Sequence, residues 1–251
     1  MAVVAADIKI HLAASHATTD AAGQGGAIDP LGRMLDAQFA AAGVPSVTSS
    51  AAGDTQNCTI VGRLADGTIN SEMLALTGTT PKNFTSIERI LSITLASGAV
   101  GTITVKEGIG GTTRHTFAIA ETDARILFYG ATANAVGGGN ATRYEKIFVF
   151  NDHATLAALG MTLEITTNPR DDYLMDLEGS VDDNNSTANR LTAPAGGDMQ
   201  GAPTWAEGPL TVVGDDLAAQ SGQGLWVQCI LAEATAPTLD VIVITSSFSS
   251  T

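Results

Sequence analysis

Alternation of apolar and polar residues with a period of two is the feature that most constrains what this chain can fold into. In the segment RILSITL, residues 89–95, leucine and isoleucine alternate with serine and threonine. The segment GTITV, residues 101–105, repeats the pattern after a short turn at residues 97–99. This alternation is typical of strands that bury one face, and it predicts a hairpin over residues 89–106.

Further segments along the chain carry the same signal, separated by turn residues. The Asp66-Gly67 pair predicts a tight hairpin between CTIVGRL and TINSEMLAL, because it tolerates the positive φ that such a turn requires. Regularly spaced strands of this kind favour an all-β protein over a fold of alternating strands and helices. We therefore expect an antiparallel β-sandwich, either one large sandwich or two small sandwich-like halves. The other expected strands are RHTFAI, ARILFYG, YEKIFVFN, MTLEITT, GLWVQCILA and TLDVIVITSSF.

One segment, residues 29–43, has the pattern of a short N-terminal helix. Asp29 can cap the first turn, Pro30 suits the first helical position, and Gly43 can end the helix. Apolar residues recur every four positions and predict one buried stripe, formed by Leu31, Leu35 and Phe39.

A glycine-rich tract, residues 131–142, has no side chain large enough to form a core and predicts a flexible loop. It separates the expected strands into two groups. The predicted organisation is an N-terminal strand, loop and short helix (1–44), a β-sandwich half (45–130), the flexible loop (131–142) and a second β-sandwich half (143–251).

Composition and charge limit the possible partners. The chain has 26 acidic and 12 basic residues and a formal net charge of −14. Binding to a nucleic-acid backbone or to an anionic membrane requires a basic surface, so we expect neither. No apolar run reaches the roughly 18 residues of a membrane span. Asp7 and Lys9 interrupt the apolar N-terminal segment, which also lacks a basic start, so we expect no secretory signal and synthesis in the cytoplasm.

Two cysteines, Cys58 and Cys229, lie in apolar segments and are expected to be buried free thiols. A disulfide between them is the alternative if the two strands are neighbours.

Residue patterns typical of catalysis are missing from the sequence. It contains no phosphate-binding loop with lysine and no Gly-x-Ser-x-Gly elbow, and neither cysteine has a nearby histidine. The histidines are spaced too irregularly for a metal site. The carboxylate pairs 171–172 and 215–216 fall in turn-like segments. We therefore expect no enzyme activity, no catalytic residue, no metal and no cofactor. The histidines are His11, His16, His115 and His153.

The most oxygen-rich stretch is GSVDDNNSTANR, residues 179–190. A calcium-binding loop requires glycine at its sixth position and glutamate at its twelfth, and counting from Asp182 or from Asp183 gives neither. The stretch predicts a turn in which Asp and Asn side chains bond their own backbone. The alternative is a cation site near residues 182–185 that does not follow the calcium-loop pattern and is completed by carboxylates from other parts of the chain.

The segments LWVQCILA and TLDVIVIT are the most apolar part of the chain, and the short turn around Pro237 predicts that they form an antiparallel hairpin. Both faces of this hairpin are apolar, so both must be covered. One face is expected in the core, and the other against a further layer or another subunit. A central position inside one chain is an equal alternative. The candidate subunit interface on the second face comprises Trp226, Ile230, Ile242 and Ile244.

Three segments carry a resemblance to a known class of proteins. RLADGTINSEMLALTGTTP, SIERILSITLASGAVGTITVKEGIGGTTR and YEKIFVFNDHATLAALGMTLEIT resemble β-sandwich structural proteins of tailed-bacteriophage virions, over about residues 55–165. The resemblance is one of short Thr- and Gly-rich hairpins with few aromatic residues, and it carries over no site residue.

The resemblance implies a non-enzymatic structural protein located in the virion. We expect a capsid decoration or cement protein that stabilises the head by contacts with the major capsid protein or neighbouring virion proteins, as a homo-oligomer. The alternatives are a neck or tail component and a carbohydrate- or receptor-binding β-sandwich module. Such a module usually needs exposed aromatic platforms, and this chain has few aromatic residues.

Overall fold

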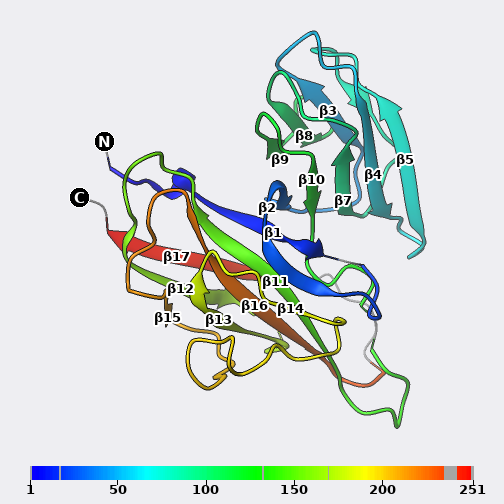
Figure 1. Ribbon diagram of the computed structural model, residues 1–251. Coiled ribbons are helices and arrows are strands. Elements are labelled where there is room, and N and C mark those ends of the chain that lie inside the picture. Colours follow the sequence, from blue (N-terminus) through cyan, green and yellow to red (C-terminus); the bar gives the residue numbers. More distant parts are fainter. Residues whose placement is uncertain (1, 17, 132, 169, 235–241, 250–251) are drawn as a thin grey trace. The chain divides into compact units, whose positions relative to one another are not determined.

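The protein is all-β, as the alternation predicts (Figure 1). Its only described helical turn is a 3-10 turn at Ala5–Asp7. The chain divides into two compact units, Met1–Asp29 with Gly130–Thr251 (unit 1) and Pro30–Tyr129 (unit 2). The computed structural model describes residues 2–16, 18–131, 133–168, 170–234 and 242–249.

Unit 1 contains two sheets. The larger has the strand order β13–β16–β11–β1–β2, with the short β14 paired to β2, and the smaller has the order β15–β12–β17. Buried apolar residues of both sheets form its interior, among them Met161 and Leu163 of β12 and Leu225 of β16. The strands are β1 (Ile8–His16), β2 (Gln24–Met34), β11 (Ala141–Asn151), β12 (Leu159–Thr167), β13 (Tyr173–Val181), β14 (Ser186–Thr187), β15 (Leu210–Thr211), β16 (Ser221–Leu231) and β17 (Val243–Ser249).

Unit 2 also contains two sheets. One has the order β10–β7–β4–β5, and the C-terminal end of β2 pairs in parallel with β10; the other has the order β6–β3–β8–β9. All other pairings in unit 2 are antiparallel. Its strands are β3 (Pro45–Ser49), β4 (Asn57–Arg63), β5 (Ile69–Ala75), β6 (Lys82–Asn83), β7 (Arg89–Leu95), β8 (Ile103–Glu107), β9 (Thr113–Phe117) and β10 (Asp123–Arg125).

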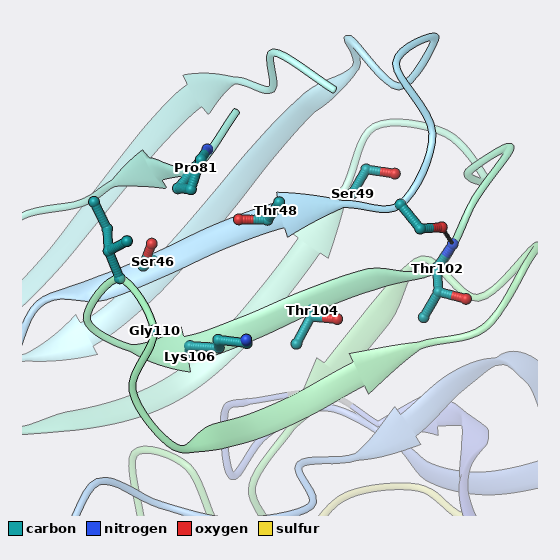
Figure 2. Close-up of a pocket in the computed structure, with 10 residues that line it drawn as sticks. Ser46, Thr48, Ser49, Pro81, Thr102, Thr104, Lys106 and Gly110 are labelled. Atoms are coloured by element: carbon teal, nitrogen blue, oxygen red, sulfur yellow. Dashed lines mark hydrogen bonds between the residues drawn. The ribbon is translucent and has the colours of Figure 1, made fainter. Parts of the chain in front are cut away.

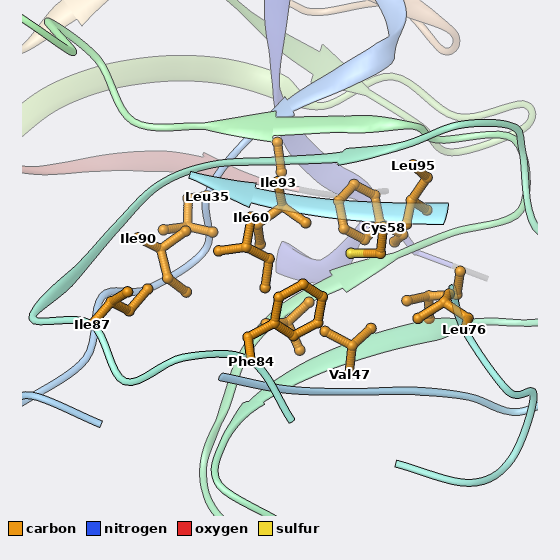
Figure 3. Packing of buried hydrophobic residues seen from close by; sticks show 14 of the residues in the cluster. Leu35, Val47, Cys58, Ile60, Leu76, Phe84, Ile87, Ile90, Ile93 and Leu95 are labelled. Atoms are coloured by element: carbon orange, nitrogen blue, oxygen red, sulfur yellow. The ribbon is translucent and has the colours of Figure 1, made fainter. Parts of the chain in front are cut away.

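The core of unit 2 lies between these two sheets (Figure 3). Strands such as β4 and β9 send alternate side chains into it, as the period of two requires. On β7, for example, Ile93 is buried and its neighbour Thr94 is exposed. The labelled core residues in the figure are Leu35, Val47, Cys58, Ile60, Leu76, Phe84, Ile87, Ile90, Ile93 and Leu95.

Of the two hairpins predicted in this unit, one is confirmed and one is wrong. β4 and β5 pair without interruption from Asn57–Ala75 to Arg63–Ile69, and Gly67 in their turn has a φ of +85°. The prediction over residues 89–106 is wrong, because β7 pairs with β4 and β10 whereas β8 pairs with β3 and β9. The turn after β7 therefore carries the chain from one sheet to the other.

The predicted helix over residues 29–43 is also wrong, because residues 24–34 are strand β2. The backbone of this segment bonds to other strands instead: Leu31 O accepts the N–H of Thr122, and Arg125 O accepts the N–H of Leu35. Leu35 and Phe39 are buried in unit 2, but Leu31 is 43% exposed, so these three residues do not form the predicted buried stripe. Pairing with β10 satisfies backbone groups that a short helix containing Pro30 and Gly32 would satisfy less well.

The predicted C-terminal hairpin is wrong as well. β16 lies between β11 and β13, and it pairs with β11 along all eleven of its residues. β17 belongs to the other sheet of unit 1 and pairs with β12. Residues 238–241 of the segment TLDVIVIT lie outside the described residues. Because both edges of β16 are already occupied by long strands, no edge is left for β17.

The last two residues of the glycine-rich tract, Ala141 and Thr142, belong to strand β11. Within the tract, the N–H groups of Gly137 and Gly139 both donate to the carboxylate of Glu233, at 2.9 and 3.0 Å. The first 29 residues do not form a separate N-terminal region, because β1 lies between β11 and β2 in unit 1.

Candidate functional site

The oxygen-rich stretch at residues 179–190 runs from the end of β13 to β14 and beyond. Asp182 has a φ of +52°, and its Oδ1 accepts the N–H of Gly222 at 2.7 Å. Asp183 Oδ1 accepts the N–H of Asn185 at 3.1 Å, a side chain bonding its own backbone two residues on. The prediction of a turn closed by its own Asp side chain is therefore confirmed.

The positive charge at this turn is the ammonium group of Lys146 on β11. Its Nζ bonds the Asp183 carboxylate, lies 3.1 Å from Glu178 Oε1, and donates to the backbone oxygen of Asn185 at 3.0 Å. The side chain of Lys146 is fully buried, with its Nζ 5.0 Å from the ring centre of Phe148. Three oxygen atoms that could hold an external cation are therefore occupied by the chain's own charge.

Glu178 connects this cluster to the centre of the sheet. Its Oε1 accepts the indole N–H of Trp226 at 2.6 Å, and its Oε2 accepts the amide of Asn185 at 2.9 Å. Burial raises the pKa of Asp183, the Lys146 ammonium lowers it, and the charge of Glu178 raises it again, so that the pKa lies above its usual value. Two buried carboxylates thus share one ammonium group, and we name these three residues the Lys146 cluster.

A second group of buried charges is formed around the next residue of β11, Glu145. Arg190, whose side chain is fully buried, pairs with the Glu145 carboxylate and lies 3.6 Å from Asp20. Arg143 pairs with the same Asp20 at 2.8 Å. Because neighbouring residues of a strand point to opposite faces, β11 carries one ion cluster on each face.

Lys146 and Glu178 were missed by the sequence reasoning. The available signal is a Glu-Lys pair inside the apolar strand YEKIFVF, because charged residues are rarely buried unless they are paired. No local pattern indicates the partners, which lie more than thirty residues away.

The residues predicted as a subunit interface do not form one surface patch. Trp226 is fully buried and packs against Tyr144, Met199 and Trp205 of its own chain. The second face of β16 is therefore internal at Trp226, covered by the segment that follows the oxygen-rich stretch, and this member of the predicted interface is unavailable to another subunit.

The other three predicted interface residues are half-buried. Ile230 lies near the end of β16, and Ile244 lies on β17, opposite Ile165 of β12. Ile242 precedes β17 and lies outside it. A contact through Ile230, Ile242 or Ile244 stays a prediction.

A shallow groove of about 320 Å³ lies on the solvent side of the β3–β8 sheet in unit 2 (Figure 2). In the register of these strands, Thr48 lies opposite Thr104 and Ser46 lies opposite Lys106. Lys106 is the charged residue among those that line the groove, and the lining includes no carboxylate and no histidine. The lining residues are Ser46, Thr48, Ser49, Ser50, Pro81, Thr102, Thr104, Lys106, Ile109 and Gly110.

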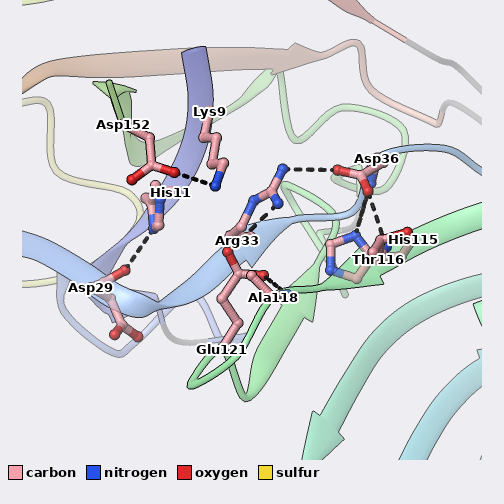
Figure 4. Close-up of polar contacts among 10 residues, drawn as sticks. All are labelled: Lys9, His11, Asp29, Arg33, Asp36, His115, Thr116, Ala118, Glu121 and Asp152. Atoms are coloured by element: carbon pink, nitrogen blue, oxygen red, sulfur yellow. Dashed lines mark hydrogen bonds and ion pairs between the residues drawn. The ribbon is translucent and has the colours of Figure 1, made fainter. Parts of the chain in front are cut away.

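The one histidine of unit 2, His115, is buried against the Phe117 ring, and its Nδ1 lies 3.0 Å from Asp36 Oδ2 (Figure 4). Burial raises the pKa of Asp36, but its contacts with His115 and Arg33 lower it by more than burial raises it. The pKa therefore lies below its usual value. Asp36 also accepts the N–H of Thr116 at 3.2 Å, which fixes the segment after β2.

The three histidines of unit 1 bond to backbone groups. The Nδ1 atom of His11 lies 3.1 Å from Asp29 O, and that of His16 lies 2.7 Å from Ala13 O. The Nδ1 atom of His153 accepts the N–H of Leu156 at 3.0 Å. Across the described ranges, no group of three or more His, Cys, Asp or Glu residues is arranged to hold a metal ion.

Both cysteines are buried free thiols, as predicted. Cys58 lies on β4 of unit 2 and Cys229 on β16 of unit 1. Burial raises the pKa of each thiol to about 12, so neither is ionised near neutral pH.

Comparison with known proteins identifies no relative, since no family model, no curated protein and no solved structure matches the chain. In the part of the chain that the structure describes, no helix has the length and apolar character to cross a membrane.

Proposed function

We propose that the protein is a non-enzymatic structural protein of a bacteriophage virion, a capsid decoration or cement protein. It stabilises the head by contacts with the major capsid protein or neighbouring virion proteins. The proposal rests on the resemblance of its Thr- and Gly-rich strands to such proteins, together with how its charged and apolar groups are distributed.

The observation that carries the proposal is the exposure of large apolar side chains on unit 2. Those more than half exposed are Ile69, Met73, Val100, Ile109 and Ile119, at 53%, 61%, 71%, 67% and 67%. They lie on strand β5 and on turns, where another protein can reach them. Covering apolar surface is favourable by about 25 cal/mol per Å², so these side chains support a function made of protein–protein contacts.

The charged groups support the same function. In the Lys146 cluster and in the Arg190–Glu145 pair, each charged group contacts an oppositely charged partner inside unit 1, an arrangement typical of structural ion pairs rather than of a reactive centre. The net charge of −14 suits a position on the outer surface of a shell, away from the packaged nucleic acid.

Quantitative mass spectrometry of purified virions tests the proposal by measuring copies of this chain relative to the major capsid protein. Hundreds of copies per particle are expected for a decoration protein. A few copies would instead indicate the alternative, a neck or tail component. If purified particles lack the chain, the virion assignment is wrong.

The hydroxyl-lined groove of unit 2 favours a second candidate function, a carbohydrate- or receptor-binding module. Thr48, Thr102 and Thr104 line the groove together with Lys106 (Figure 2), and hydroxyl groups both donate and accept hydrogen bonds. A glycan array tests this candidate. Binding that is lost in Thr104→Ala and retained in Thr94→Ala, a matched threonine on β7 outside the groove, would support it.

A further inference from the structure

Strand β5 is an open edge of unit 2. It ends the strand order β10–β7–β4–β5, and it pairs only with β4 among the described strands. Its side chains alternate between exposed and half-buried, and none is buried. The exposed face carries Ile69, Ser71, Met73 and Ala75.

The hydrogen bonds beyond each end of β5 show which of its backbone groups are free. Leu64 donates to Thr68 O at 2.8 Å, and Leu76 donates to Gln56 O at 3.0 Å. In an antiparallel pair, alternate residues direct both backbone groups toward the partner. Because the register is unbroken, the backbone N–H and C=O groups of the even-numbered residues of β5 point toward β4. The N–H and C=O groups of residues 69, 71, 73 and 75 point to the open edge.

Other edge strands in the described part of the chain are short, irregular or already bonded. β6 and β15 have only two residues each. β9 is five residues long, and its Arg114 O accepts the N–H of Ala37. β13 exchanges bonds with the segment at Asp198–Ala206, through Met175 and Gly179. The pairing of β17 with β12 is interrupted by two irregularities of register.

β5 shows none of this protection. It is seven residues long, contains no Pro, Lys or Arg, and pairs with β4 without irregularity. A long, regular, partly apolar edge is the kind of edge that adds a strand from another chain.

We propose that β5 pairs with β5 of a second copy of this chain, in an antiparallel, two-fold symmetric arrangement with Ser71 on the axis. The inference deepens the proposed function, on which it rests, by naming one contact of the assembly. A two-fold contact uses the same patch on both copies, so the strand must be complementary to itself.

The sequence of β5 selects this register. The new hydrogen-bonded pairs join odd-numbered residues, whose backbone groups point outward. Axes that also pair at least five residues of each β5 lie at Ser71, Glu72 or Met73. An axis at Glu72 places two Glu72 carboxylates opposite each other, which is destabilising. An axis at Met73 leaves Ile69 opposite residue 77, beyond the end of β5.

The axis at Ser71 instead pairs Ile69 with Met73 on both sides of it. It also places the amide of Asn70 opposite Glu72; Oε2 of Glu72 already accepts the N–H of Thr85 at 2.6 Å, and its Oε1 can accept a hydrogen bond from the Asn70 amide. The two exposed large apolar side chains of β5 thereby contact each other, and no like charges meet across the contact.

Disulfide trapping tests this register. In Ser71→Cys the two new cysteines lie opposite each other at about 5.5 Å between Cα atoms, within the range that a disulfide spans. Mild oxidation is expected to give a covalent dimer. Met73→Cys is the matched control, because its two copies lie about 13 Å apart along the strands. Wild-type protein should give no covalent dimer, since Cys58 and Cys229 are both buried. Cross-linking at position 73 but not at 71 overturns the register.

Charge exchange tests the pairing without oxidation. Ile69→Lys and Met73→Glu place charges at the contact on exposed positions, so each variant is expected to fold and to sediment as a monomer. When the two variants are mixed, the introduced lysine of one copy faces the introduced glutamate of the other, and a heterodimer is expected. Val100→Lys, a similarly exposed position away from β5, should sediment as wild type.

Sedimentation of the wild type completes the test. Dimerisation is expected to strengthen with salt, because each copy carries a net charge of −14 and salt screens the repulsion. A wild type that stays monomeric at all concentrations and salt levels overturns the pairing. If such a monomer is nevertheless abundant in virions, the proposed function stands alone. A dimer of the wild type with no copies in virions contradicts the proposed function instead.

Discussion

At the scale of single residues, the polar side chains that matter most to this fold are buried and paired. Lys146, Glu178 and Asp183 meet from two strands and a turn, and the one ammonium group contacts both carboxylates inside unit 1. Such a cluster contributes little relative to an apolar core, but removing one member leaves a buried charge without compensation.

Replacing Lys146 with methionine keeps the apolar stem and removes the ammonium group. Two buried carboxylates then lose their counter-charge, and the free energy of unfolding is expected to fall by about 3 to 5 kcal/mol. Urea unfolding measures the change. Lys9→Met is the matched control: Lys9 pairs with the partly exposed Asp152, and its loss should cost less than about 1 kcal/mol. Equal effects of the two substitutions would show that the Lys146 cluster has no special structural role.

Asp54 gives unit 2 a dependence on pH. It is buried, and its carboxylate accepts the Ser49 hydroxyl and the N–H groups of Val100 and Gly101. Burial raises the pKa of Asp54, but these hydrogen bonds lower it by more than burial raises it. The pKa therefore lies below its ordinary value of 3.8. The ionised carboxylate therefore stabilises the fold above pH 3.8, and this contribution is lost as the pH falls through the lower folded-state pKa.

Asp54→Asn is accordingly expected to lower the free energy of unfolding by about 2 kcal/mol at pH 7. The difference from wild type should shrink as the pH falls from 3.8 towards the lower folded-state pKa, at which the carboxylate of the folded protein becomes protonated. Urea unfolding at several pH values measures it. A difference that is constant with pH would mean that the charge of Asp54 makes no contribution.

At the scale of elements, close contacts between strands explain glycines that the alternation alone does not. Gly62 lies on β4 where the register with β7 shifts, and a Cβ there would come within 2.6 Å of Ile87 Cγ2. Ile87 is itself buried in the unit 2 core.

Gly62→Ala is therefore expected to overpack this core and to cost about 1 to 3 kcal/mol. Thermal unfolding measures the effect. Gly53→Ala is the control, because a Cβ there meets no atom within 4 Å. If Gly62→Ala and Gly53→Ala have the same melting temperature, Ile87 moves aside without a cost in stability and the packing at this point is loose.

At the scale of the whole molecule, the two units differ in how the chain builds them. Unit 2 is continuous, Pro30–Tyr129, and its buried cluster is made entirely of residues from that range. Unit 1 is discontinuous, because β1 and the first part of β2 come from the N-terminal segment, whereas its other long strands come from after residue 129.

A fragment comprising residues 30–129 is expected to fold alone, since it contains both of its sheets and a complete core. The fragment should give a dispersed NMR spectrum and a single cooperative urea transition. The matched fragment 130–251 lacks β1 and should not fold cooperatively. A fragment 30–129 that unfolds without cooperativity would show that unit 2 depends on the remainder of the chain.

The sequence by itself determined the features that depend on neighbouring residues. Period-two alternation identified most strands and the faces that they bury, as on β7. The Asp66-Gly67 pair located the β4–β5 turn, and the stretch at Asp183 was identified as a turn that bonds its own backbone. These features follow from pleat geometry, turn dihedral angles and short hydrogen bonds, all of which act within a few residues.

Only the tertiary structure decided which segments become neighbours. β7 and β8 have the pattern of a hairpin but lie in different sheets, and so do β16 and β17. Residues 32–34 form the end of strand β2 because β10 supplies a partner, although Leu31, Leu35 and Phe39 also fit a helical stripe. The carboxylates that hold Lys146 come from residues 178 and 183. The physical reason is the same in each case: hydrogen bonds and ion pairs between distant segments are set by competition among all available partners, and a local pattern contains no information about that competition.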